Sequence, residues 1–444
     1  MQQTLFLVPQ SWLEGPLLIA WLVLGGVIMA ALALRKGQPA DAFSFLPIYI
    51  VVAAIFYFVA PRVGITDINP ADPNGPEIKV GLAIRGYGVM MLAGIFAGVG
   101  LSVYRGQRQG FDPEKIITLA FWMCICGVIG ARLFYVIQKR DQFSGSIPEM
   151  LGEMINMTQG GLVVYGSLIG ATAGGAFYLW YSKIPMLRMA DIAMPGMLVG
   201  LALGRIGCLM NGCCFGGVCD IPQIAQPFPA GSPPYLRQIE TGELLGIRPE
   251  KTLTSDDLPI RPEAAERYAK SILPGSLAEQ AGVRPEQWYA VGFTSNRPDK
   301  ELRAIKQRGL TIDSSVAISQ GDQWHSVPFN DLPSQSLGVY PTQILAAINA
   351  ALLAALLWWY FPFRRRNGQV FALGIILYSV TRFCLELIRR DEAGQFGTQL
   401  TISQWVSLIV VLGGVLLFVA GPRKQQDSLE RRVADPRDRS AGTA

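Results

Sequence analysis

The sequence predicts an all-α polytopic membrane protein that carries a small soluble α+β insert. Three observations indicate this class: long runs without charge, a basic bias of alternate connections, and one polar stretch without a span-length apolar run. Half of the 444 residues are hydrophobic and only 16% are charged, a balance that ordinary soluble domains do not have. We therefore expect nine membrane spans.

The predicted spans have about 20 residues each, the length that an α-helix needs to cross the hydrocarbon core. Six contain no Asp, Glu, Lys or Arg, namely 16–34, 43–60, 86–104, 160–182, 340–363 and 404–420. Three hold charged residues: 116–138 contains Arg132, 192–211 contains Arg205, and 369–388 contains Arg382 and Glu386. The first run is too long for the apolar region of a signal peptide, so we expect it to remain in the protein.

Lys and Arg predict the orientation, because positively charged loops stay in the cytoplasm. Of the basic residues in short connections, 16 fall on one side and 6 on the other. The N-terminus is therefore expected outside, and the basic tail 421–444 inside. This bias accounts for the net charge of +5, so we expect no nucleic-acid partner.

Residues 220–338 differ from the rest, since charges, Pro and Gly are frequent there. We expect a soluble extracytoplasmic insert that divides the membrane part into 84–219 and 339–420, with two further spans and an outer loop in 1–83. Within the insert, 271–331 resembles a PDZ domain, although Glu286 and Gln287 replace the usual Gly-Asp. Such a module binds an extended peptide by strand addition. The alternative is a small cap over the membrane part.

Arg205 is the only charged residue between Asp191 and Asp220. An Arg at membrane depth costs roughly 2.5 to 3.5 kcal/mol on insertion scales, so it usually faces a polar cavity or a partner. The glycines around it, Gly204, Gly207, Gly212 and Gly216, predict that this stretch is not a regular helix throughout. Irregular backbone at this depth must be buried in protein or line a cavity.

Other charges join Arg205 in the predicted spans or at their ends: Arg132, Arg382, Glu386 and Arg389. Arg382 and Glu386 are four residues apart and share one helix face. A cavity with several Arg and only one carboxylate is short of negative charge, which an anionic ligand could supply. Guanidinium groups bind phosphate oxygens through two hydrogen bonds at once. We therefore expect a phospholipid headgroup from the outer leaflet. The alternative is that each Arg binds backbone carbonyls or Glu386 for structure alone.

The string Gly204-Arg205-x-Gly-x-x-x-Asn211-Gly212-x-x-x-Gly216 resembles the signature of the prolipoprotein diacylglyceryl transferases. Further segments resemble the family in the same order: Ile84 to Gly88, Gly130 to Arg132, Gly161 to Gly170, Tyr340 to Gln343 and Tyr378 to Arg389. The resemblance implies a seven-span core in a bacterial inner membrane, with the two N-terminal spans and the insert outside it. It also implies transfer of diacylglycerol from phosphatidylglycerol to the lipobox Cys of a prolipoprotein.

The resemblance also implies the site. Catalytic roles fall to Arg205, Arg382, Tyr165 and Glu386, and substrate binding to Tyr87, Arg132, Asn211, Gly216, Tyr378 and Arg389. Arg205 and Arg382 would converge on the phosphodiester and stabilise charge on the leaving phosphate. The attacking group is a substrate thiol with a free pKa near 8.5, which must lose its proton to act.

The sequence departs from the family where many members have His, Asn and Glu, since Tyr165, Cys208 and Cys213 stand there. The only His is His325 in the insert, which we expect to be an ordinary surface residue. Either arginine electrostatics suffice without a base, or Tyr165 acts as the base, or the reaction is a related transfer. A lipid transporter and an inactive lipid-binding protein are the alternatives from other classes.

Four cysteines crowd the outer end of the Arg205 segment: Cys208, Cys213, Cys214 and Cys219. Outside the membrane they can form one or two disulfides, and spacing alone leaves the pairing open. No Cys-x-x-Cys is present, so we expect no metal site, and we expect no cofactor.

Overall fold

The computed structural model describes residues 4–13, 15–36, 50, 53, 57, 65–72, 76–140, 143, 154, 161, 163–252, 267–387, 398 and 400–422. They form two compact units. The first unit comprises Met1–Met90, Arg205–Ile344 and Ile388–Ala393, and the second comprises Met91–Gly204, Leu345–Leu387 and Gly394–Ala444.

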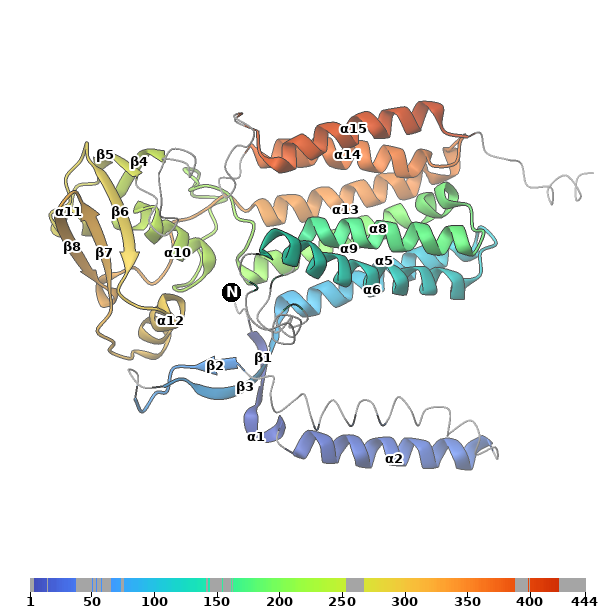
Figure 1. The fold of residues 1–444 in the computed structure, drawn as a ribbon, viewed down its shortest axis with the longest axis horizontal. Helices are drawn as coiled ribbons and strands as arrows, with labels where there is room; N and C mark the ends of the chain where they lie inside the picture. Colours follow the sequence, from blue (N-terminus) through green and yellow to red (C-terminus); the bar gives the residue numbers. More distant parts are fainter. Residues whose placement is uncertain are drawn as a thin grey trace, which may run out of the picture. The chain divides into compact units, whose positions relative to one another are not determined.

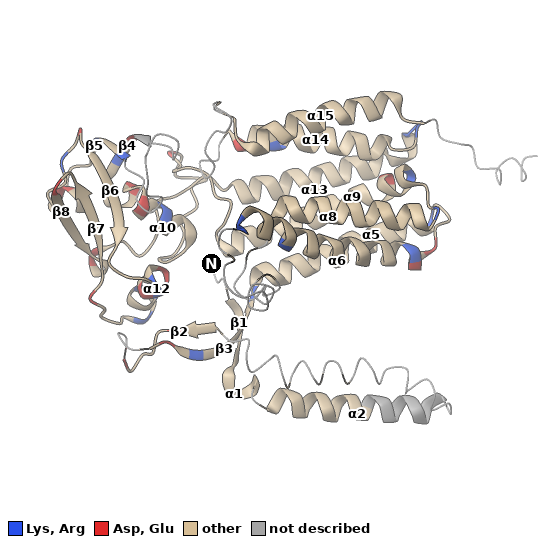
Figure 2. Ribbon diagram, viewed as in Figure 1, with Lys and Arg blue, Asp and Glu red and all other residues tan. Residues whose placement is uncertain are grey.

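Apolar helices form the second unit (Figure 1). They are α5 (Gly86–Gln107), α6 (Pro113–Gln138), α8 (Val164–Tyr181), α9 (Met186–Asn211), α13 (Thr342–Tyr360), η5 (Phe361–Phe363), α14 (Gln369–Glu386) and α15 (Ile402–Ala420). The first residues of α5 and α13 and the last of α9 belong to the first unit. Helices α8, α13 and α15 carry no charged residue (Figure 2), as a lipid environment requires.

Six helices among the described residues are long and apolar enough to cross a membrane, which confirms six of the predicted spans. They are α5, α6, α9, α13 with η5, α14 and α15. Helix α8 lies at the predicted span 160–182 but is not one of the six, and α2 (Pro16–Lys36) lies at the first predicted span. Most of 43–60 lies outside the described residues, so a total of nine stays a prediction.

Local sequence signals set the helix ends. Asp112 caps α6 by accepting a hydrogen bond from the Glu114 amide, with Pro113 in the first turn. Thr401 and Gln404 form a capping box at the start of α15. Helix α9 ends before Gly212, whose φ of 77° suits a residue without Cβ.

Small residues bring the backbones of the second unit together. A Cβ on Gly170 of α8 would overlap the Cys126 carbonyl oxygen of α6, and one on Gly166 would overlap that of Gly130. Between α5 and α9, a Cβ on Gly98 would lie 2.7 Å from the Gly196 oxygen. Helices in lipid associate through such close packing, since apolar burial gives no net drive there.

A buried charge cluster lies in the same unit. The Asp191 carboxylate of α9 is fully buried and accepts hydrogen bonds from the amides of Gly368 and Phe371, at the start of α14. Its Oδ2 lies 3.6 Å from Nε of Arg364, whose Nη1 donates to the Phe361 oxygen. A carboxylate at a helix N-terminus is stabilised by the unpaired amides and the helix dipole. Asp191 therefore fixes the start of α14 against α9.

The first unit contains two antiparallel sheets. The smaller has the order β1 (Thr4–Pro9), β3 (Ile78–Arg85), β2 (Ile65–Asp67), and a short α1 (Gln10–Leu13) follows β1. The sequence analysis did not predict this sheet, and the two spans and outer loop expected in 1–83 stay a prediction. Strands β1 and β3 pair across more than 70 residues of sequence, a contact that no local pattern indicates.

The insert holds a five-stranded sheet whose strands are neighbours in chain order (Figure 1). They are β4 (Ile247–Thr252), β5 (Arg267–Ile272), β6 (Trp288–Phe293), β7 (Ser315–Gln320) and β8 (Gln323–Pro328), accompanied by α10 (Pro233–Glu240), η3 (Glu243–Leu245), α11 (Leu277–Gln280), α12 (Pro298–Arg308) and η4 (Phe329–Asp331). Strand β7 alternates, with Val316 and Ile318 buried. They share a core with Tyr235 of α10 and Leu302 of α12.

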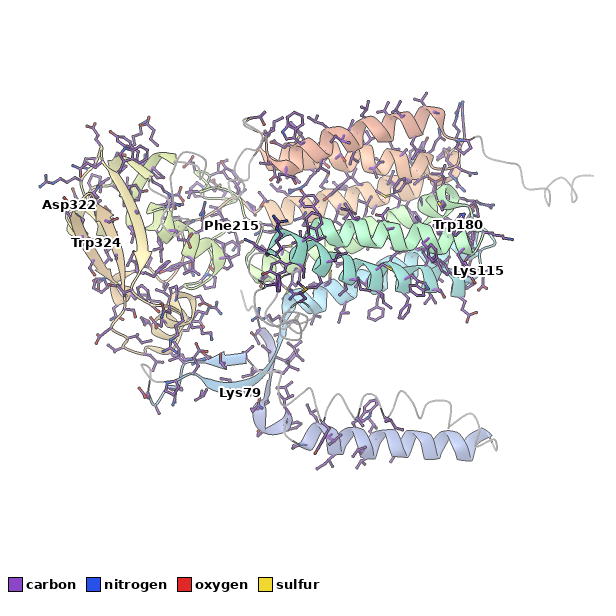
Figure 3. The ribbon with its side chains drawn as sticks, in the orientation of Figure 1. Lys79, Lys115, Trp180, Phe215, Asp322 and Trp324 are labelled. Atoms are coloured by element: carbon purple, nitrogen blue, oxygen red, sulfur yellow. The ribbon has the colours of Figure 1, made fainter. Side chains whose placement is uncertain are left out.

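The region that resembles a PDZ domain contains α11 and β6 at the expected helix and strand. Strand β8 forms one edge of the sheet, and Trp324 on it is 74% exposed (Figure 3). Peptide binding by the insert stays a prediction.

The segment after the second predicted span packs with the insert. Ile68, which follows β2, is buried in the insert core. Glu77, just before β3, accepts from Lys300 of α12 at 2.5 Å and lies 3.5 Å from Arg297. Asp67 is paired with Arg308 at the end of the same helix. The described residues around β2 and β3 therefore pack with the insert.

Substituting Gly170 with Ala tests the close approach of α6 and α8. The added methyl overlaps a backbone carbonyl, so the helices must separate, and we expect a loss of about 1 to 3 kcal/mol of stability. Thermal unfolding of the purified protein in detergent measures it. Gly100→Ala on α5 is the control, because no atom lies within 4 Å of its Cβ position. Equal melting temperatures for the two variants would contradict the close contact.

The ion pairs of Glu77 predict a pH dependence. Hydrogen bonds from Lys300 and then Thr66 hold the pKa of Glu77 below its ordinary value of 4.5. The contribution is therefore present above the unfolded pKa and is lost as pH falls through the lowered one. We expect Glu77→Gln to cost about 0.2 to 1 kcal/mol at neutral pH, since the pairs are partly exposed.

The measurement compares thermal unfolding of wild type and Glu77→Gln at neutral pH and at about pH 3. The difference should shrink in acid, and exposed Asp72→Asn should show no such difference. A Glu77→Gln deficit that persists unchanged in acid would exclude the ion pair as its cause.

Candidate functional site

Arg205 lies two turns before the end of α9, with Tyr87 of α5 nearby. A Cβ on Gly207 would lie 3.3 Å from the Tyr87 ring, so this glycine permits the two helices to meet beside the tyrosine. The charge of Arg205 and the thiols of Cys208, Cys213 and Cys214 lie within electrostatic range of the Tyr87 hydroxyl. Two predicted site residues, Arg205 and Tyr87, therefore occur together in the first unit.

Helix α9 is regular through Gly204 and Gly207 and ends at Asn211. We expected that this stretch would not be a regular helix throughout, and the helix does end within it. Before that end, Gly207 lies against Tyr87 and Met90 of α5 in a close contact that offsets the low helix propensity of glycine. Irregular backbone begins only at Gly212. There, Cys214 also has a positive φ of 59°, which is uncommon for a residue with a side chain.

The loop after α9 is bound to the segment that leads into α13. The Gly216 amide donates to the Tyr340 oxygen at 3.1 Å, and a Cβ on Gly216 would lie 2.6 Å from Cβ of Tyr340. Thr342 Oγ1 donates to the Cys214 oxygen, and Gln343 Nε2 donates to the Cys213 oxygen. The sequence identified Tyr340 to Gln343 only as a family segment. In the structure these residues hold the loop that carries Gly216.

A cavity of about 260 Å³ lies beside Asn211 in the first unit. Its walls come from the end of α9, the start of the insert, α12 and β1: Thr4, Met210, Asn211, Gly212, Phe228, Pro229, Ala230, Ser232, Arg303 and Gln307. Ser232 is 4% exposed, and its Oγ has no hydrogen-bond partner among the described residues. Buried polar atoms are normally paired, so this hydroxyl is available to a bound group.

In the second unit, Tyr378, Arg382 and Glu386 follow one another at four-residue spacing on α14 and share a face. Arg382 Nη1 lies 2.7 Å from Oε2 of Glu386, and its Nη2 donates to Ser403 of α15 at 2.9 Å. The Glu386 side chain is only 1% exposed, whereas that of Arg382 is 17% exposed. The predicted pair is present, and Ser403 is a partner that the sequence did not indicate.

Arg132 of α6 is buried and donates to the carbonyl oxygens of Met154 and Gly161 at 2.8 and 3.1 Å. These contacts match the structural alternative for this Arg, and substrate binding by it stays a prediction. Tyr165, the second residue of α8, is half-buried. Arg389 lies outside the described residues. Because Arg205 and Arg382 belong to different units, their convergence on one phosphate also stays a prediction.

None of the seven cysteines, all of which lie among the described residues, forms a disulfide in the structure, so the bridges that we considered are not present there. Three of them, Cys208, Cys213 and Cys214, have sulfur atoms within 4.8 Å of one another. The spacing of the cysteines in the sequence did not predict this cluster, because the turn at Gly212 brings the following residues back beside α9.

His325 on β8 is not a plain surface residue, since its Nδ1 lies 2.8 Å from the Ala281 oxygen.

Long apolar helices that also bear arginine define a multi-pass membrane protein with a polar site. A model of the prolipoprotein diacylglyceryl transferase family matches residues 77–420, which include the insert. The chain therefore belongs to the prolipoprotein diacylglyceryl transferase family. This confirms the resemblance on which the sequence prediction rested.

Curated relatives agree with the family. A phosphatidylglycerol–prolipoprotein diacylglyceryl transferase of Rhodopirellula baltica is 34% identical, and the alignment covers 94% of this chain and 89% of the relative. Relatives with this name from Clostridium tetani and, as its enzyme 2, Clostridium perfringens are 26% and 24% identical over 76% of the chain. Because the first alignment covers 94% of this chain, it includes most of 1–83 and most of the insert. The similarity to this relative therefore extends beyond the seven-span core that the motifs indicated.

The Arg382–Glu386 pair predicts a pattern of stability. Arg382→Ala leaves a buried carboxylate without this partner, and we expect a loss of about 3 to 5 kcal/mol. Replacing both residues by Met and Leu removes both charges, and we expect most of the stability to return. Thermal unfolding in detergent measures both variants, with Ser403→Ala as a mild control. An Arg382→Ala variant as stable as wild type would show that the pair does not stabilise α14.

Proposed function

We propose that this chain transfers the diacylglyceryl group of phosphatidylglycerol to the lipobox cysteine thiol of a prolipoprotein. The sulfur attacks the glycerol carbon of the diacylglyceryl group, the bond from that carbon to the phosphate oxygen breaks, and glycerol phosphate leaves with the electron pair. The product is a thioether. Family membership over residues 77–420 and a relative of this name that aligns with 94% of the chain support the proposal.

The observation that carries the proposal is Arg205 beside Tyr87 in the family signature. A guanidinium remains charged when desolvated and binds phosphate oxygens as a fork. In the proposed reaction Arg205 holds the phosphodiester and stabilises the charge that develops on the leaving phosphate. Tyr87 and Asn211 bind the lipid headgroup, and Gly216 allows the loop beside them to pack against Tyr340.

Arg382 supplies the second guanidinium in the proposed site. Glu386 and Ser403 hold it at 2.7 and 2.9 Å, so its orientation is set before lipid binds. Such preorganisation avoids the cost of reordering the side chain as charge develops. Tyr378 and Arg389 continue the substrate-binding face, and Arg132 positions the backbone around Gly161.

The acceptor thiol must lose its proton before it attacks. We assign this step to the field of the arginines, which favours the thiolate, and to Tyr165, which takes up the thiol proton as its phenolate. A positive environment lowers the pKa of a thiol because it favours the thiolate. The cavity beside Asn211 and Ser232 is the proposed entry point for the acceptor peptide.

The proposed location is the bacterial cytoplasmic membrane, with the N-terminus outside and the C-terminus in the cytoplasm. Lys115 at the start of α6 and Trp180 at the end of α8 lie at the same end of the antiparallel pair α6 and α8 (Figure 3). Lys115 belongs to the basic connections that predict the cytoplasmic side. Trp180 is 67% exposed, which suits an aromatic side chain at a membrane interface.

Arg205→Ala tests the proposal. We expect transfer to fall by about 100-fold or more, the usual cost of removing a preorganised charge donor, while membrane insertion is unchanged. The assay uses labelled phosphatidylglycerol and a lipobox peptide, and it measures thioether product and glycerol phosphate. Arg108→Ala is the matched control, because Arg108 is exposed and lies over the Tyr104 ring. Full activity of Arg205→Ala would remove this residue from the mechanism.

The same assay separates the alternatives. Lipid movement across a vesicle membrane without thioether product would indicate a transporter, and lipid binding without either would indicate an inactive binding protein. Complementation of a bacterium that lacks its own transferase provides an independent test. Growth and lipoprotein maturation are expected with the wild-type chain and not with Arg205→Ala.

A further inference from the structure

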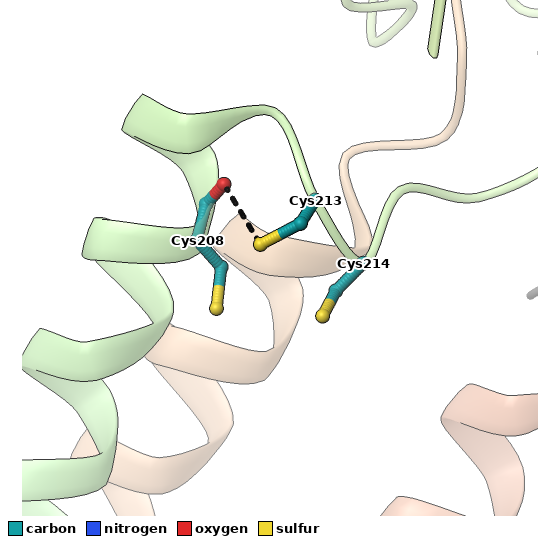
Figure 4. Close-up of side chains that lie close together, drawn as sticks. All are labelled: Cys208, Cys213 and Cys214. Atoms are coloured by element: carbon teal, nitrogen blue, oxygen red, sulfur yellow. Dashed lines mark hydrogen bonds between the residues drawn. The ribbon is translucent and has the colours of Figure 1, made fainter. Parts of the chain in front are cut away.

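Three thiols meet at the end of α9, outside the roles assigned above. Cys208 lies in the last turn of the helix, and Cys213 and Cys214 follow in the loop (Figure 4). Their sulfur atoms all lie within 4.8 Å of one another, and each residue is half-buried. The Sγ of Cys213 is 3.8 Å from the Cys208 carbonyl oxygen. These are the three cysteines within electrostatic range of Tyr87.

The separations suit a metal ion. A zinc–sulfur bond is about 2.3 Å long, so thiolates around one ion lie about 3.8 to 4.0 Å apart in tetrahedral or trigonal geometry. Sulfur atoms within 4.8 Å need only small rotations of their side chains to reach this separation. Soft thiolate ligands select zinc or Cu⁺ over hard cations such as Mg²⁺.

The backbone holds the three residues in place. The amides of Gly212 and Cys213 both donate to the Cys208 oxygen, at 2.9 and 3.1 Å. Thr342 and Gln343 bind the carbonyl oxygens of Cys214 and Cys213 from the far side of the loop. These contacts hold the three residues together without the sulfur atoms, whose one contact given above is that of Cys213 Sγ with the Cys208 oxygen.

A disulfide explains the cluster less well. Cys213 and Cys214 are adjacent, with Cα atoms about 3.8 Å apart, below the range of ordinary disulfides. A bridge from Cys208 to either one would leave the third thiol unused. One ion uses all three.

We propose that Cys208, Cys213 and Cys214 bind one thiophilic metal ion, Zn²⁺ or Cu⁺, with a coordination position left open to water. The bound ion fixes the loop between Asn211 and Gly216 against the end of α9. The inference does not depend on the proposed transferase activity, because binding is measured directly.

The experiment uses the full chain in detergent, purified with a non-thiol reductant. After exposure to Zn²⁺ and removal of excess, metal content is measured by mass spectrometry, and Co²⁺ substitution is followed by its thiolate charge-transfer absorption. A parallel arm titrates Cu⁺ against a chromogenic chelator and decides between the two ions. We expect one ion per chain and a thiolate band with Co²⁺.

The matched variants are Cys208→Ser, Cys213→Ser and Cys214→Ser, with Cys219→Ser as the control. The Cys219 thiol is 3.5 Å from the Ile221 oxygen and is not in the cluster. Each cluster variant is expected to lose affinity by more than about tenfold, and the control to bind as wild type. Bound metal should also protect the three thiols of the wild-type chain, and not Cys219, from alkylation, a readout that needs no variant.

Several results would overturn the proposal. They are less than one ion per chain in both metal arms, equal loss in Cys219→Ser, or cluster thiols that neither ion protects. A missing thiolate band with Co²⁺ would exclude Zn²⁺ and leave the Cu⁺ arm to decide. A stable disulfide between Cys208 and Cys213 or Cys214 in protein extracted from membranes would also overturn the proposal.

Discussion

The cost of holding a charge away from water constrains the described part of this protein more than any other interaction. Each buried charge has a partner that reduces this cost. Asp191 receives two backbone amides and lies near Arg364, Arg132 donates to two carbonyl oxygens, and Arg382 lies against Glu386 and Ser403. Such charges are expensive to bury alone, so their partners determine how neighbouring helices meet. The Asp191 contacts begin α14, and the Arg382 contact with Ser403 joins α14 to α15.

Close backbone contact is the second constraint, and it has consequences for the site. The glycines of α6, α8, α5 and α9 allow carbonyl oxygens of one helix to lie where a Cβ would otherwise be. In the same way, the missing Cβ of Gly207 allows close contact with Tyr87, and the missing Cβ of Gly216 allows close contact with Tyr340. Glycine in these positions lowers helix propensity but removes the steric barrier to packing. The polar residues of the signature thus occur where the backbone can approach a ligand or a neighbouring segment closely.

Much of the helical part and several site contacts were predictable from local patterns. Six spans follow from uncharged runs, and the Arg382–Glu386 pair follows from four-residue spacing on a helix. The pairing of β1 with β3 was not predictable, because these two strands are far apart in the sequence. The low helix propensity of glycine indicated an irregular backbone in this stretch but not where it begins. The helix continues through Gly204 and Gly207, and the irregular backbone begins at Gly212. The thiol cluster was not predicted because Cys208, Cys213 and Cys214 lack the Cys-x-x-Cys spacing. They meet only because the chain reverses direction at Gly212, after the end of α9.

The sequence by itself determined that the chain is a membrane protein, which family it belongs to and which residues carry the family signature, because apolar length, charge and motif order are local properties. Only the tertiary structure decided which partners the charged side chains have. It also decided that Ile68, just after β2, is buried in the insert core, and that Thr342 and Gln343 hold the loop after α9. These are contacts between residues distant in sequence. Their energies depend on distances that no single segment encodes.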